Sequence, residues 1–79
     1  MDRSDVIDRL TPIARKVFEN NDLVLSDELS AETLDTWTSL SFMQFLTAIE
    51  QEFGFRFKMM ELLSLKSMGS IIDSIANHC

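Results

Sequence analysis

The stretch DTWTSL at residues 35–40 decides the fold, together with the helical pattern that follows it as far as Phe53. The hydroxyls of Thr38 and Ser39 can accept hydrogen bonds from the unpaired amides at the start of a helix. Gly54 supplies a stop, because glycine readily adopts the left-handed conformation that ends many helices. We therefore predict a helix over residues 39–53. Its first turn places a serine at the positive end of the helix dipole, where a phosphate group is stabilised.

This predicted helix has two distinct faces when its residues are spaced at about 100° each. The apolar face, expected in the core, comprises Phe42, Phe45, Leu46, Ile49 and Phe53. The mixed face comprises Ser39, Leu40, Met43, Gln44, Thr47, Glu50 and Gln51. Leu40 and Met43 are therefore expected near the surface, on the same side as the serine. Trp37 precedes the cap and can pack on Phe42 as a hydrophobic staple, which fixes how the chain enters the helix.

An amphipathic helix is also predicted near the N-terminus, between Asp2 and Asn20, because apolar residues recur there at spacings of three and four. Pro12 interrupts this pattern. It either kinks one helix or restarts it, with Thr11 as the cap and Pro12 at the first position. We favour the kinked single helix, because both halves keep one apolar stripe.

The remaining segments predict one long loop and two shorter helices. Residues 23–38 lack a clear apolar period and indicate a loop with one helical turn around residues 31–34. After Gly54, the chain is expected to tuck Phe55 or Phe57 under the helices. A short helix is predicted over residues 59–65, and Ser67 can cap a fourth helix. The fourth helix has the apolar stripe Met68, Ile71, Ile72, Ile75 and Ala76. We expect an all-α four-helix bundle with a long first loop and a short third helix, forming a single domain over residues 1–79.

Composition narrows the class of protein. The chain has 79 residues, 46% of them hydrophobic, which suffices for one small core. No apolar run approaches the roughly 20 residues of a membrane span. The first residues lack the features of a signal peptide, so we expect a cytoplasmic protein. A monomer is the default expectation for a small charged bundle. The net charge of −6 disfavours binding to nucleic acid or anionic lipid and favours basic partners.

The residues that usually carry catalysis or bind metals are scarce. His78 is the only histidine, Cys79 is the only cysteine, and both lie in a terminus expected to fray. A serine–histidine pair, a metal site and a disulfide are therefore not expected. With two glycines in all, the chain also lacks a glycine-rich phosphate loop. We expect that the protein is not an enzyme.

Two motifs at the correct spacing resemble the acyl carrier protein family. Residues 35–40 (DTWTSL) and 45–57 (FLTAIEQEFGFRF) are similar to that family's Gly-Trp-Asp-Ser-Leu and to its later Ala-(Leu/Ile)-Glu-x-x-Phe-Gly-Ile run. Similar residues also occur at positions 10–18, 23–29 and 65–68, so the resemblance covers nearly the whole chain.

The resemblance implies a covalent cofactor. A phosphopantetheinyl transferase would convert Ser39 to a 4′-phosphopantetheine phosphodiester. The thiol of this arm, not Cys79, would carry an acyl or aminoacyl group as a thioester. The carrier would then present this group to acyl-transferring or acyl-activating enzymes. The alternative is a degenerate carrier-like module that never receives the arm and acts in protein–protein interaction. The sequence does not distinguish fatty acid, polyketide, aminoacyl or envelope-lipid cargo.

The sequence departs from the family pattern at the motif and on the partner face. Thr36 replaces a common glycine, and Thr38 replaces the aspartate that the family uses in transferase recognition. Thr38 can still cap the helix. Carriers usually dock through an acidic second helix, whereas here the mixed face offers only Glu50 as an acid. We therefore predict that docking depends more on Leu40 and Met43 than on charge. The full predicted partner face is Thr38, Leu40, Met43, Gln44, Thr47, Glu50 and Gln51.

Overall fold

The first helix, α1, runs from Arg3 to Val17 in the computed structural model, which describes all 79 residues. Pro12 lies inside this helix, so the prediction of one helix through the proline is confirmed and a restart at Thr11 is wrong. The Thr11 hydroxyl donates to the Ile7 carbonyl at 2.6 Å. Because proline has no amide hydrogen, one intrahelical hydrogen bond is missing at Pro12, but the helix continues past it.

The end of α1 comes earlier than the predicted Asn20, because the chain turns sharply at Glu19. Glu19 has a φ of 54°, in the left-handed region. The Asn20 amide donates to the Arg15 carbonyl at 3.0 Å, and the Glu19 amide donates to the Lys16 carbonyl at 3.4 Å. This pair of bonds is a Schellman motif, which satisfies carbonyls at the end of a helix.

The second helix, α2, runs from Ser39 to Phe53, as predicted. The Thr38 hydroxyl accepts a hydrogen bond from the Ser41 amide at 3.2 Å, and the Ser41 hydroxyl oxygen accepts one from the Thr38 amide at 2.7 Å. This reciprocal arrangement is a capping box. Gly54 ends the helix with a φ of 74°. The predicted core face is confirmed: its middle residues are buried and its end residues, Phe42 and Phe53, are half-buried.

The two remaining helices are α3, Met59–Leu62, and α4, Met68–His78. The prediction that the third helix extends to Leu65 is wrong. The chain leaves the helix after one turn, and Leu65 packs into the core with 4% of its surface exposed. Ser67 caps α4 as predicted, accepting from the Ser70 amide at 3.3 Å.

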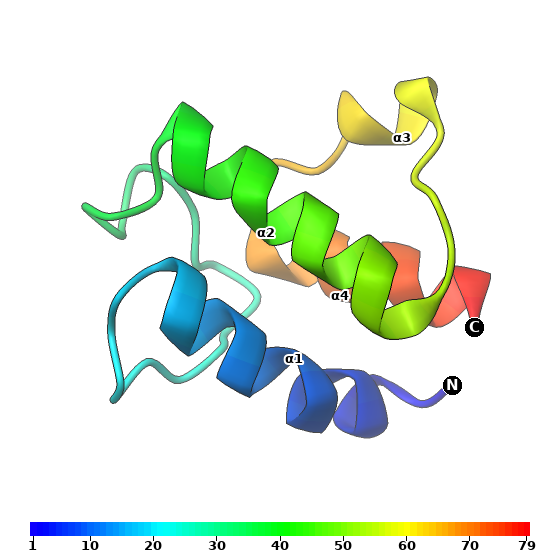
Figure 1. Ribbon diagram of the computed structural model, residues 1–79, viewed down its shortest axis with the longest axis horizontal. Helices are drawn as coiled ribbons and strands as arrows, with labels where there is room; N and C mark the ends of the chain where they lie inside the picture. Colours follow the sequence, from blue (N-terminus) through cyan, green and yellow to red (C-terminus); the bar gives the residue numbers. More distant parts are fainter.

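The four helices are arranged so that α1 packs against both α2 and α4, while α3 lies apart at the upper edge (Figure 1). The loop between α1 and α2 crosses one end of the molecule and contributes Leu23, Leu25 and Trp37 to the core. Phe18 lies at the centre of this end, with its ring centroid 5.2 Å from that of Trp37 and 5.0 Å from that of Phe45. The predicted all-α, four-helix class is confirmed. None of the helices combines the length and apolar character needed to span a bilayer.

Candidate functional site

Ser39 is the first residue of α2, and its side chain is exposed. Its hydroxyl makes no hydrogen bond within the protein, and the amides of Ser39 and Leu40 have no acceptor in the chain. Both amides belong to the first turn, where a helix leaves its donors unpaired and carries a partial positive charge. This helix start therefore offers a free hydroxyl beside two free donors, a combination that suits a phosphate ester.

Ser41 has the opposite environment, although it is only two residues away. It is buried, with 8% of its surface exposed. Its hydroxyl donates to the Thr36 carbonyl at 2.7 Å while accepting from the Thr38 amide. This role of Ser41 was not predicted. The sequence does carry a signal for it, because the Thr-Ser-Leu-Ser spacing places a hydroxyl residue three positions after the cap.

An aromatic stack holds the approach to Ser39 in place. The rings of Trp37 and Phe42 are stacked with centroids 5.9 Å apart, so the predicted staple is confirmed. Trp37 also stacks on Phe18, the residue that follows α1. The entry into α2 is thus anchored to the core through two aromatic contacts.

The mixed face of α2 carries exposed apolar and uncharged polar side chains. Leu40 and Met43 are exposed to 70% and 57%, as the sequence predicts. Gln44, Thr47 and Gln51 are also exposed. The first turn of α2 contains no acidic residue. These observations describe a surface with little charge beside Ser39.

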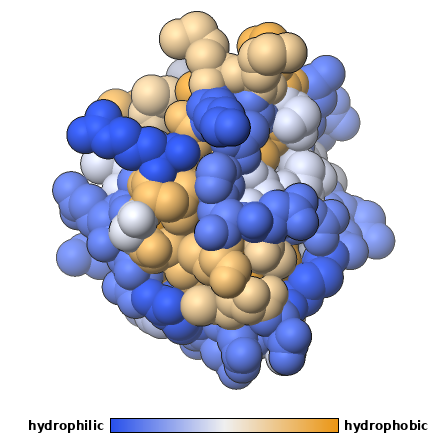
Figure 2. Space-filling view, turned by 90° about the vertical axis from the view of Figure 1, so that its right-hand side faces the viewer, coloured by the Kyte–Doolittle hydropathy of each residue, from blue (hydrophilic) through white to orange (hydrophobic).

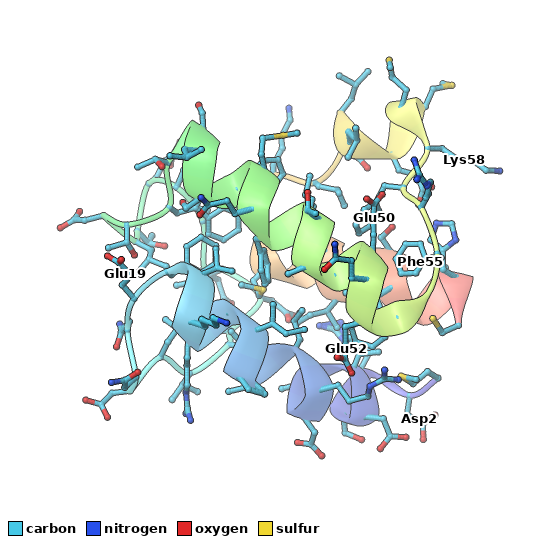
Figure 3. The ribbon with its side chains drawn as sticks, in the orientation of Figure 1. Asp2, Glu19, Glu50, Glu52, Phe55 and Lys58 are labelled. Atoms are coloured by element: carbon cyan, nitrogen blue, oxygen red, sulfur yellow. The ribbon has the colours of Figure 1, made fainter.

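Glu50 belongs to this face in sequence but is turned away from it. It is half-buried, and its carboxylate accepts a hydrogen bond from the Phe57 amide at 2.8 Å. Figure 3 shows Glu50 directed toward the loop that follows α2. Its carboxylate therefore fixes this loop, and helps to hold Phe57, which is buried as predicted.

A second polar cluster joins α3 to the end of α4 around Glu61. The Glu61 carboxylate accepts from the Lys58 amide, from the Ser74 hydroxyl at 2.8 Å, and lies 2.8 Å from Nε2 of His78. The Lys58 amide, followed by Ser74 and His78, lowers the pKa of Glu61 from 4.5 to about 2. His78 also stacks on Phe55, with centroids 4.3 Å apart. These contacts join His78 to Glu61 and to Phe55.

Both the sequence and the fold are similar to those of known proteins. The family described as "Phosphopantetheine attachment site" matches residues 9–75. The chain belongs to this family. The fold is also similar to the solution NMR structure of the holo acyl carrier protein from Geobacter metallireducens, with a TM-score of 0.85 and 38% sequence identity. That match covers 91% of this chain and 83% of the other. A search of curated proteins finds no significant match.

These matches establish the chain as an acyl carrier that bears a covalent 4′-phosphopantetheine group. Neither match favours the alternative of a degenerate module that lacks the arm. A carrier of this kind acts together with partner enzymes. The free hydroxyl and the two unpaired amides at the start of α2 fit the phosphate end of the cofactor.

Proposed function

We propose that Ser39 carries the 4′-phosphopantetheine group. The observation that supports this most strongly is the contrast between the two neighbouring serines. Ser39 is exposed with a free hydroxyl, whereas the Ser41 hydroxyl is buried and holds the helix cap together. A transferase can reach the first without unfolding α2, but modification of the second would break the capping box.

In this proposal, each residue at the start of α2 has a separate task. The Ser39 oxygen forms the ester bond to the phosphate, and the amides of Ser39 and Leu40 face the added negative charge. Thr38 maintains the helix start through its bond from the Ser41 amide. The bound arm supplies a thiol that holds an acyl or aminoacyl group as a thioester. The chain itself positions this group and needs no catalytic side chain.

We further propose that partner enzymes dock on the mixed face of α2. These partners are a phosphopantetheinyl transferase and the acyl-transferring or acyl-activating enzymes that use the arm. The large exposed fractions of Leu40 and Met43 support an apolar contact. The uncharged side chains of Gln44, Thr47 and Gln51 support a polar rim around it. Because Glu50 is engaged by the Phe57 amide, charge contributes little on this face.

The attachment proposal is tested by intact mass measurement after incubation with coenzyme A, magnesium and a broad-specificity phosphopantetheinyl transferase. Wild type is expected to gain one phosphopantetheinyl group, and Ser39→Ala none. Ser4→Ala is a matched control, since Ser4 is an exposed serine in the first turn of another helix, α1. This control is expected to behave like wild type. Thiol reagents are unsuitable as a readout, because the exposed Cys79 would react as well.

Two results would count against the proposal. Full modification of Ser39→Ala would place the arm on another residue. No modification of wild type by several transferases would support the degenerate module instead.

A further inference from the structure

The short helix α3 exposes an unusual amount of apolar surface for its length. Met59, Met60 and Leu63 are exposed to 80%, 83% and 74%, and no residue of α3 is buried. Figure 2 shows apolar side chains gathered at the top of the molecule, over α3, with hydrophilic side chains directly below them. Contiguous exposed apolar side chains with a polar border are typical of binding sites.

The charges around α3 have the opposite sign to those of the rest of the chain. Residues 55–66 contain three cations and one acid, while the remaining residues contain four cations and twelve acids. The three cations are Arg56, Lys58 and Lys66, and none of them forms an ion pair. Figure 3 shows Lys58 pointing away from the body of the protein.

The single acid of this segment does not cancel these charges at the surface. The Glu61 carboxylate is engaged by the Lys58 amide, by Ser74 and by His78, on the side that faces α4. The helix α3, its two caps and the connections on either side therefore carry three exposed apolar side chains and three cations that form no ion pair. We call this set of residues the α3 patch: Arg56, Lys58, Met59, Met60, Leu63 and Lys66.

We propose that the α3 patch docks on a partner protein whose surface has an apolar pocket bordered by carboxylates. Charge complementarity supports acidic groups around the pocket, and the exposed methionines and leucine support its apolar floor. The patch adjoins the mixed face of α2 at one point, because Arg56 lines a hollow together with Thr47, Glu50 and Gln51. The inference does not depend on modification of Ser39.

An anionic membrane is the other surface that could bind a patch of cations and apolar side chains. The negative charge on the rest of the protein and the shortness of α3 both disfavour such binding. The twelve acids outside the segment lie on a molecule only 28 × 24 × 21 Å in extent. At an ionic strength of about 0.15 M the Debye length is about 8 Å, so part of this negative charge still acts near a membrane surface. A helix of four residues also offers far less buried area than an interfacial amphipathic helix.

The test uses the 15N-labelled, phosphopantetheinylated protein and two water-soluble helical peptides. The peptides share one leucine face and carry either glutamate or lysine along both borders of that face. The glutamate peptide is expected to shift the amide signals of residues 55–66 saturably, with weaker binding as salt increases. The lysine peptide is expected to leave these signals unchanged.

Variants locate the interaction within the patch. Arg56→Gln and Lys66→Gln are each expected to weaken binding of the glutamate peptide about threefold at low ionic strength. Leu63→Ser is expected to weaken it at every salt concentration. Lys16→Gln and Val24→Ser are the matched controls, because both residues are exposed and lie outside the patch. These controls are expected to bind as wild type does.

Several outcomes would overturn the proposal. These are equal binding of the lysine peptide, signal shifts confined to other residues, and absence of binding at millimolar peptide. Binding to phosphatidylglycerol vesicles that Leu63→Ser abolishes would identify a membrane as the occupant and would also overturn it. Because Ser39→Ala is expected to bind the glutamate peptide normally, failure here is distinguishable from failure of the attachment proposal.

Discussion

Replacing Thr38 separates its two possible contributions, the helix cap and the recognition of the carrier by a transferase. Thr38→Ala removes the hydroxyl that accepts from the Ser41 amide at 3.2 Å. The reverse bond, from the Thr38 amide to the Ser41 hydroxyl oxygen, is retained because it uses the backbone. Loss of one cap acceptor lowers the free energy of unfolding by about 1 kcal/mol. For a domain of this size we expect the melting temperature to fall by about 4–8 °C.

Thr38→Asp keeps an acceptor at the cap and adds a negative charge at the positive end of α2. We expect this variant to be at least as stable as wild type, with a gain of about 0.3–1 kcal/mol at low ionic strength. The aspartate also restores the charge that the acyl carrier family has at this position. We therefore expect a broad-specificity transferase to modify Thr38→Asp about fivefold faster than wild type. This factor corresponds to about 1 kcal/mol, the contribution of one favourable exposed ion pair.

The assay measures the rate of arm attachment by intact mass, alongside thermal unfolding of each variant. At a temperature where both proteins are folded, Thr38→Ala is expected to be modified at the wild-type rate, because neither carries the charge. If Thr38→Asp is modified no faster than wild type, the missing acid does not limit recognition. If Thr38→Ala is slowed severely while remaining folded, the hydroxyl itself takes part, and the reasoning from charge is wrong.

Three further predictions follow from individual contacts. The pKa of Glu61 in the folded protein, about 2, lies below its ordinary value of 4.5, so its stabilising contribution is complete above about pH 5 and is lost as the pH falls towards 2. Urea unfolding at several pH values should show this loss in wild type and a smaller one in Glu61→Gln. Gly69→Ala is expected to lower the free energy of unfolding by about 1–3 kcal/mol, because the added Cβ would meet the Cβ of Asp27 at 2.9 Å; an unchanged melting temperature would contradict this. Leu40→Ser and Met43→Ser are expected to weaken binding to a cognate enzyme by the same factor at about 50 mM and about 500 mM salt, as measured by calorimetry. A contribution that disappears at high salt would show that the mixed face of α2 acts through charge.

The helix boundaries that could be predicted from sequence are those set by local chemistry. Thr38, Gly54 and Ser67 each start or stop a helix through contacts with residues at most four positions away. Such contacts are visible in the order of residues, and all three predictions were confirmed. The end of α1 was predicted too late, because a non-glycine residue, Glu19, takes the left-handed conformation that glycine or asparagine usually takes.

The contacts that could not be predicted join residues far apart in the chain. Arg3 forms ion pairs with Asp27 and Asp73, which lie 24 and 70 positions away. His78 lies against Glu61, 17 positions away. No periodicity encodes such pairs, since they depend on how the helices pack in three dimensions.

The candidate site shows the same division between local and distant effects. The exposure of Ser39, Leu40 and Met43 follows from the helical wheel and agrees with the structure. The orientation of Glu50 does not follow from the wheel, because a backbone amide seven residues later, at Phe57, draws its carboxylate toward the loop. A wheel places a residue on a face, but the neighbouring segments decide where a long side chain points.

The measurement that tests the central proposal most directly is fragmentation of the modified peptide that contains both Ser39 and Ser41. After reaction with coenzyme A and a transferase, fragment ions that separate the two serines assign the arm to one of them. We predict that every fragment containing Ser39 without Ser41 carries the phosphopantetheinyl group. An arm found on Ser41, or on any residue outside the start of α2, would contradict the proposal.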